Sequence, residues 1–300
     1  MERNIINHFF LTSKPYSYAG EISRGILFTL ILLPPNFDSS IIISACISLL
    51  MWLYFNWQSD YIQRNKGRLK PPRTLFLIPF VISALLAYYL NTFMGFLGIV
   101  IYALSIILYS YKAKYKLIGL FGPILRLLNG LAFFIALSLI FNLSITGQAF
   151  LTAFVVSFFL AIRNLVGDVR DINTDKYEFP ARYGAKPSAN LIRFSLLFLI
   201  IISIISGTKN INLYAISFVI LSWIIFEILI LKLNYERADL WGYLFHRTLI
   251  ISVTIFHLLL ITTYLNDFRI YLFIIVLLLI TQPFYFYLPS KSFKKLKEIF

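Results

Sequence analysis

The chain has 300 residues, of which 59% are hydrophobic and 13% are charged, and its formal net charge is +14. A soluble domain of this length does not need so much apolar surface, so the composition excludes a soluble globular protein and predicts an integral, multi-pass membrane protein. An excess of lysine and arginine is typical of the cytoplasmic loops of such proteins, and we therefore expect no nucleic-acid partner.

Ten apolar segments are long enough to be membrane spans. We expect them to form one all-α domain that covers residues 1–300 and lies in the lipid bilayer. In chain order the segments cover roughly residues 19–35, 38–58, 74–92, 95–111, 120–142, 146–167, 189–206, 211–232, 244–264 and 268–288.

The links between these segments alternate in charge. The links after the second, fourth, sixth and eighth segments carry most of the basic residues. In the links on the opposite side, the only basic residues are Lys209 and Arg269. Because basic loops are retained on the cytoplasmic side, we expect both termini and the charged links to face the cytoplasm, most simply across a cell membrane.

The polar stretch that follows the sixth segment reads RNLVGDVRDINTDKYEFPARYG, residues 163–184. Asp168, Asp171 and Asp175 are spaced i, i+3 and i+7, so on a helix their side chains point to one side. Carboxylates this close repel one another and lose hydration beside lipid, which favours a bound divalent cation. Oxygen ligands combined with substrate phosphates are typical of Mg²⁺. The alternative is a solvated acidic helix cap.

This stretch resembles the second aspartate motif of the UbiA superfamily of intramembrane prenyltransferases, because DVRDINTD has the form DxxDxxxD. The family's first motif, NDxxDxxxD, is resembled by the stretch after the second segment, where Asn56 and Asp60 match. Trp57 and Arg64 stand where the family has aspartate. Asn56, Asp60 and Arg64 are spaced i, i+4 and i+8 and share a helix face.

A third stretch, LYSYKAKYKLIG at residues 108–119, is similar to a family run of the form Tyr-Ser-x-Lys-x-Lys. Tyr109, Ser110, Lys112 and Lys114 match it. Phenol and ammonium groups stabilise the negative charge that accumulates on a departing diphosphate. Taken alone, the same residues are more typical of a basic cytoplasmic loop that carries no chemistry.

The resemblance implies a bundle of nine to ten transmembrane helices around a central cavity that opens to the cytoplasmic side. It implies transfer of a prenyl group from a prenyl diphosphate to a hydrophobic, aromatic or other lipid-soluble acceptor, with Mg²⁺ as cofactor. The metal ligands would be Asp60, Asp168, Asp171 and Asp175. The catalytic residues would be Asp60, Tyr109, Asp168 and Asp171, and the substrate-binding residues Asn56, Arg64, Lys112, Lys114, Arg163 and Asn164.

Alternatives remain open at this point. Other chemistry occurs on the same scaffold, namely phosphoribosyl transfer to a polyprenyl phosphate and terpene cyclisation. The departures at Trp57 and Arg64 favour a non-catalytic relative that binds an isoprenoid or another membrane protein. A secondary transporter would carry internal repeats and broken helices at matched positions, and the sequence has no convincing repeat.

Six further polar residues lie inside the apolar segments. Glu21 with Arg24, and Arg126 with Asn129, are spaced i, i+3, so each pair could line a polar cavity; for Glu21 and Arg24 the alternative is that they pair with each other. His257 is expected to make an interhelical hydrogen bond, whereas Glu227 has no visible partner.

Overall fold

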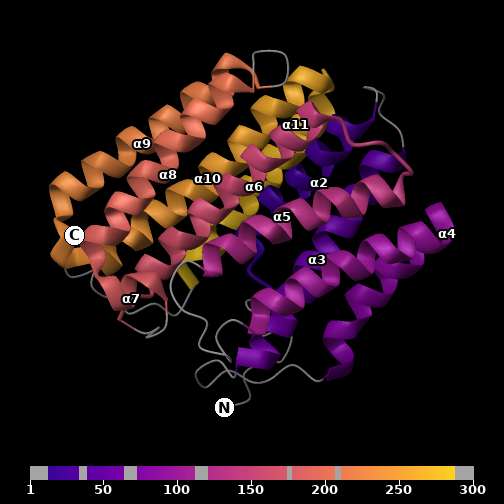
Figure 1. The fold of residues 1–300 in the computed structure, drawn as a ribbon, viewed down its shortest axis with the longest axis horizontal. Helices are drawn as coiled ribbons and strands as arrows, with labels where there is room; N and C mark the ends of the chain where they lie inside the picture. The colour runs from indigo at the N-terminus through magenta and orange to yellow at the C-terminus, as the bar shows by residue number, and fades with distance from the viewer. Residues whose placement is uncertain are drawn as a thin grey trace.

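The computed structural model describes residues 13–33, 39–63, 73–111, 121–173, 178–206 and 211–287. The described part is an all-α bundle, which confirms the fold class (Figure 1). Its long helices are α2 (Tyr18–Leu32), α3 (Ser39–Gln63), α4 (Arg73–Tyr111), α5 (Phe121–Ile140), α6 (Gly147–Arg170), α8 (Ala185–Ile205), α9 (Leu213–Leu233), α10 (Ala238–Tyr264) and α11 (Phe268–Thr281). Its short helices are η1 (Pro15–Ser17), α7 (Phe179–Tyr183), η2 (Tyr235–Arg237) and η3 (Gln282–Tyr287).

Within the described part, 8 helices are long and apolar enough to cross a membrane. One of them, α4, is interrupted at Asn91 and Thr92, whose backbone angles are not helical, so it consists of two arms (Figure 1). Gly95 permits this turn, because a Cβ there would lie 2.0 Å from the Ala87 carbonyl oxygen. The two arms correspond to the segments expected at 74–92 and 95–111. Helix α2 has 15 residues and ends at Leu32, because the backbone of Leu33 is extended, so it is shorter than the segment expected at 19–35.

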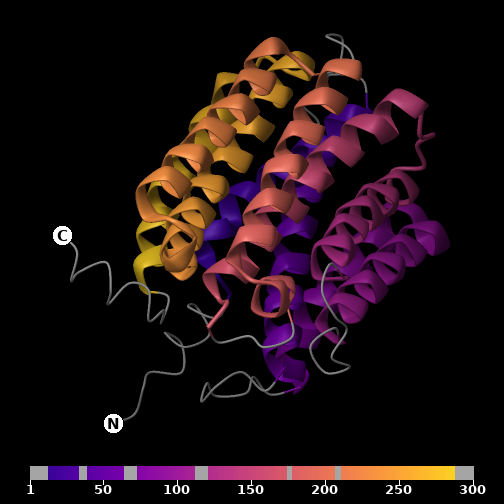
Figure 2. The ribbon, with the colours of Figure 1, turned by 60° about the vertical axis from the view of Figure 1, so that its left-hand side comes forward.

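Helices α2 and α6 occupy the middle of the bundle. Helix α2 packs against α3, α10 and α11, and α6 packs against α5, α8 and α10. In Figure 2 the purple and magenta helices α4 and α5 lie on one side and the orange and yellow helices α9 to α11 on the other. The segment Gly147–Arg170 is accordingly the most enclosed of the candidate spans, with 72% of its most apolar stretch buried.

The course of the chain brings the charged residues of α2, α5 and α6 to the same level of the bundle. Helices α5 and α6 are antiparallel neighbours joined by residues 141–146, so the beginning of α5 lies beside the end of α6. Small residues let these helices approach closely, since a Cβ on Gly130 would meet the Ser157 side chain at 2.5 Å. The charged residues in the first turns of α2 and α5 therefore meet those in the last turns of α6.

Candidate functional site

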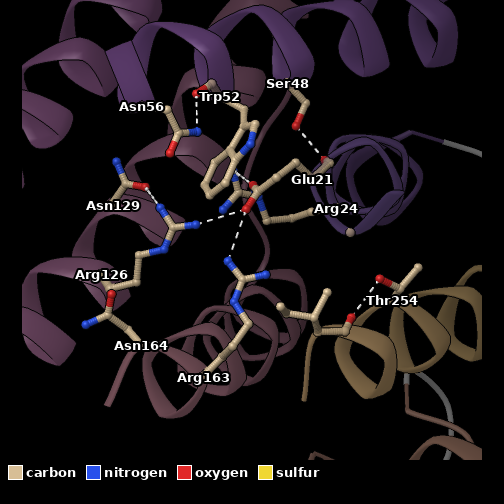
Figure 3. A network of polar contacts seen from close by, with 12 residues as sticks. Glu21, Arg24, Ser48, Trp52, Asn56, Arg126, Asn129, Arg163, Asn164 and Thr254 are labelled. Atoms are coloured by element: carbon tan, nitrogen blue, oxygen red, sulfur yellow. Dashed lines mark hydrogen bonds and ion pairs between the residues drawn. The ribbon is translucent and has the colours of Figure 1, made fainter. Parts of the chain in front are cut away.

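Three arginines from three helices converge on one buried carboxylate (Figure 3). Glu21 of α2 lies 2.7 Å from Arg24 on its own helix, 2.9 Å from Arg126 of α5 and 3.5 Å from Arg163 of α6. All four side chains are buried, with Glu21 and Arg24 at 0% exposure. We call these four residues the arginine cluster.

The arginine cluster is not balanced in charge. Three formal positive charges face one negative charge, and the remaining contacts are neutral: Arg24 donates to the Tyr102 hydroxyl at 3.0 Å, and Arg126 to Asn129 Oδ1 at 3.1 Å. Arg24 Nε and Nη1 and Arg163 Nη1 are buried without a hydrogen-bond partner in the part described. A buried charge without a counter-charge is costly, so this arrangement favours a polyanionic ligand.

Aromatic rings form one wall of the arginine cluster. The Arg126 guanidinium lies 5.3 Å from the Trp52 ring and 5.0 Å from the Phe55 ring, and these two rings stack on each other. Guanidinium groups over ring faces gain cation–π stabilisation, which holds them in place without consuming their N–H donors. Asn56 lies nearby on α3, buried at 1% exposure, and its amide donates to the Trp52 carbonyl at 2.8 Å.

A chain of hydrogen bonds connects the third sequence motif with the second. The Tyr109 hydroxyl of α4 donates to Asn164 Oδ1 at 2.5 Å, and Asn164 Nδ2 donates to Asp168 Oδ2 at 3.4 Å. The Tyr109 ring also packs on Phe55, the ring that lies beneath Arg126. Tyr109, Asn164 and Asp168 therefore form one polar site next to the arginine cluster.

Asp171 follows the last residue of α6 and forms an ion pair with its neighbour. Arg170 Nε donates to Asp171 Oδ1 at 3.1 Å and Nη2 to Oδ2 at 2.6 Å. The carboxylate remains accessible, with 43% of its side chain exposed. Asp171 thus lies one helical turn beyond Asp168, as the motif spacing predicts. Its carboxylate, however, is paired with Arg170.

The described carboxylates fit a divalent cation in type, because Asp168 and Asp171 supply the oxygen donors that Mg²⁺ prefers. Among the residues described, however, no three of His, Cys, Asp and Glu come together in a group that would hold a metal. The remaining predicted site groups lie outside the described residues, namely the side chain of Asp60 and the residues Arg64, Lys112, Lys114 and Asp175. The described half of the predicted ligand set is thus compatible with Mg²⁺.

The sequence interpretation did not bring Glu21, Arg24 and Arg126 together with Arg163. Each i, i+3 pair was visible, and Glu21 does pair with Arg24 as Arg126 does with Asn129. The joining of the two pairs spans 105 residues of sequence and depends on how α2, α5 and α6 pack. His257 makes the expected interhelical contact, 3.0 Å from the Ser23 hydroxyl of α2. Glu227 is paired with Arg193 of α8.

An apolar groove of about 160 Å³ lies between α5, α6 and α8. Its walls include Leu127 of α5, Phe158 and Ile162 of α6, and Leu191 of α8. Leu127 and Ile162 are sequence neighbours of Arg126 and Arg163, so the same two helices carry the arginine cluster and the groove. The groove has the character of a hydrocarbon site, since its lining is almost wholly apolar.

No known family pattern and no curated protein sequence matches the chain. Its fold does match solved structures. A digeranylgeranylglyceryl phosphate synthase superposes with a TM-score of 0.60 at 20% identity, covering 86% of this chain and 98% of that one. A UbiA homologue from Archaeoglobus fulgidus superposes with a TM-score of 0.61 at 14% identity, covering 86% and 99%. The same homologue bound to GPP and Mg²⁺ gives 0.60 at 15% identity, covering 86% and 99%.

Fold and site together define a multi-pass helical membrane protein whose interior carries clustered basic and acidic side chains. Within that class the chain has the fold of the UbiA homologues, over nearly their whole length.

Proposed function

We propose that the chain is a UbiA-type intramembrane prenyltransferase that moves a prenyl group from a prenyl diphosphate to a lipid-soluble acceptor. The observation that carries this proposal is the arginine cluster, whose unbalanced positive charge lies beside the Tyr109–Asn164–Asp168 site. A diphosphate is the polyanion that such a site would attract inside a membrane protein. A structural neighbour was solved with GPP and Mg²⁺, and another structure of it with DMAPP and Mg²⁺.

In this proposal Asp168 and Asp171 would hold Mg²⁺ together with Asp60 and Asp175. Bound Mg²⁺ supplies positive charge that neutralises the diphosphate oxygens. Asn164 orients Asp168 through its amide, and Tyr109 fixes Asn164 from the other side. Asn56, Arg64, Lys112 and Lys114 complete the substrate-binding set expected from the sequence.

The protein's own contribution to the reaction is to stabilise the leaving group. The bond between the prenyl C1 and a diphosphate oxygen breaks with its electron pair remaining on oxygen, so negative charge grows on the diphosphate. Arg24 and Arg163 have free N–H groups for that charge, and Arg126 adds a third guanidinium. The acceptor supplies the electron pair for the new bond and loses a proton. The groove between α5, α6 and α8 would accommodate the apolar tail.

Calorimetric titration of the purified protein with geranyl diphosphate tests this function. We expect binding in Mg²⁺, and loss of most of the Mg²⁺-dependent part in Asp168→Asn, because the amide keeps the shape but removes a charged ligand. Arg126→Met should weaken binding by about 10–100-fold, the usual value of hydrogen bonds to a charged group. A wild-type protein that binds no prenyl diphosphate with or without Mg²⁺ would contradict the proposal.

A non-catalytic isoprenoid-binding relative is the second candidate, favoured by Trp57 and Arg64 in the first motif. The two functions differ in one measurement. An enzyme releases diphosphate when mixed membrane lipids are present as acceptors, whereas a binding protein retains the donor intact. Phosphate detection after pyrophosphatase treatment, with Asp168→Asn as control, separates them.

We also propose that the aspartate motifs face the cytoplasm. With Cys46 replaced by serine, Lys186→Cys at the start of α8 and Asn266→Cys between α10 and α11 should react with an impermeant maleimide from opposite sides of the membrane. Lys186→Cys should be labelled only after the cytoplasmic side is made accessible. Labelling of both from one side would contradict this topology.

A further inference from the structure

The ion pair between Arg170 and Asp171 occupies a carboxylate that the proposed function assigns to metal. Both oxygens of Asp171 receive a hydrogen bond from the planar guanidinium, at 2.6 and 3.1 Å. Two-point contacts of this kind are stronger and more directional than a single contact between neutral groups. A cation that approaches Asp171 therefore has to share the carboxylate with Arg170 or displace it.

The third nitrogen of Arg170 is held as well. Arg170 Nη1 lies 3.3 Å from Nδ1 of His246, a residue of α10 that is buried at 8% exposure. Because a guanidinium only donates, the ring nitrogen that faces it must be the unprotonated acceptor, and His246 carries its proton on Nε2. The Tyr285 hydroxyl of η3 lies 3.0 Å from the same Nδ1 and 3.1 Å from the Tyr243 carbonyl oxygen, so its one proton faces two acceptors.

The backbone around Arg170 leaves it little room to move. A Cβ on Gly242 would lie 2.7 Å from the backbone nitrogen of Arg170, so α10 packs directly against the last turn of α6. Tyr285 is fully buried, with the Tyr16 ring of η1 against it at 5.1 Å. The direction of the Arg170 guanidinium is thus set by α10 and η3, and that direction is toward Asp171.

We propose that Arg170 is a positioning residue that competes with the divalent cation for Asp171 and so lowers the metal affinity of the site. The proposal rests on the proposed function, in which Asp171 is a metal ligand. Its distinctive consequence is a gain: removing the guanidinium takes away the competing two-point contact, and metal binds more tightly. A residue with only a structural role would weaken metal binding when removed, or leave it unchanged.

The test measures Mn²⁺ binding to the purified full chain in detergent by electron paramagnetic resonance, without substrate. Arg170→Met should bind Mn²⁺ about tenfold more tightly than wild type, the lower end of the effects that groups around metal ligands produce. Arg170→Lys keeps the charge but loses the two-point contact, so its gain should be smaller. In an Asp171→Asn background, Arg170→Met should produce no gain, because the shared carboxylate is gone.

Tyr271→Phe is the matched control, because Tyr271 belongs to α11 and its hydroxyl donates to the Leu265 carbonyl in a different part of the bundle. Its Mn²⁺ affinity should equal that of wild type. If Arg170→Met does not fold, the Mn²⁺ affinity of Arg170→Lys tests the proposal in its place. Unchanged or weaker Mn²⁺ binding in the folded Arg170 variants overturns this inference alone. Failure of every variant and of wild type to bind Mn²⁺ overturns the inference together with the metal site of the proposed function.

Discussion

Two of the ion-paired regions in the described helices differ in their balance of charge. On α8 and α9, Arg193 and Glu227 meet at 2.6 and 2.7 Å, Arg193 Nη1 donates to Asn190 and Trp223 donates to Glu227. One positive charge meets one negative charge, and every nitrogen of that guanidinium is used. In the arginine cluster three guanidiniums share Glu21 and three of their nitrogens have no described partner.

The difference separates a structural contact from a candidate ligand site built from the same residue types. The Arg193–Glu227 pair is complete in itself and leaves nothing for a ligand to satisfy. The arginine cluster is more deeply buried, with its residues at 0–6% exposure, and still carries excess positive charge. Charge balance, and not burial or residue type alone, therefore distinguishes the candidate ligand site from the structural pair.

The largest effect is expected from Glu21→Gln, which leaves three buried guanidiniums around a neutral amide. Loss of one partner from a buried ion pair costs about 3–5 kcal/mol, so the free energy of unfolding in detergent should fall by this amount. Inorganic pyrophosphate should restore part of the loss, because it replaces the missing negative charge. The matched control Glu227→Gln should lose less stability and gain nothing from pyrophosphate. Equal behaviour of the two variants would remove the contrast between the regions.

Arg163→Met should have the next largest effect, and on ligand binding in particular. Its unpartnered Nη1 is available to a phosphate oxygen, so affinity for geranyl diphosphate should fall by about 10–100-fold in calorimetry. Arg193→Met removes the same side chain from the balanced pair and should leave that affinity unchanged. An equal loss in both variants would mean that the effect comes from stability.

The smallest effect is expected from replacing the balanced pair as a whole. A double variant with Arg193→Met and Glu227→Leu should stay within about 1 kcal/mol of the wild-type free energy of unfolding, since apolar side chains often replace an ion pair without loss. Each single variant should be less stable than the double, because it leaves one charge unpaired beside lipid. A double variant less stable than both singles would show that the pair is essential to the packing of α8 and α9.

The sequence alone was sufficient for the architecture, because long apolar segments leave few options other than membrane helices. Two of the stretches singled out in the sequence also meet, since Tyr109 of the third motif donates to Asn164, which in turn donates to Asp168. Local spacing predicted the pair Glu21–Arg24, because residues one turn apart on a helix meet whatever the rest of the fold does.

What spacing cannot predict is which helices pack together. Arg126 and Arg163 reach Glu21 only because α2 packs against both α5 and α6. The partner of Asp171 was also not apparent, although Arg170 precedes it directly. Adjacent residues on a regular helix point in different directions, and the contact forms because α6 ends at this point.

The junction of η1 with η3 has a consequence for how the protein is made. Tyr16 and Tyr285 are among the first and last described residues, and they meet, with Gln282 donating to the Tyr16 carbonyl at 3.2 Å. A growing chain emerges from the ribosome and enters the bilayer helix by helix. Until α11 has been inserted and Tyr285 has followed it, His246 Nδ1 lacks its contact with the Tyr285 hydroxyl, and the Tyr16 ring lacks the Tyr285 ring that packs against it. Newly made protein thus completes this junction only after η3 has been made, and a chain released before that point would leave Tyr16 and His246 without their contacts to Tyr285.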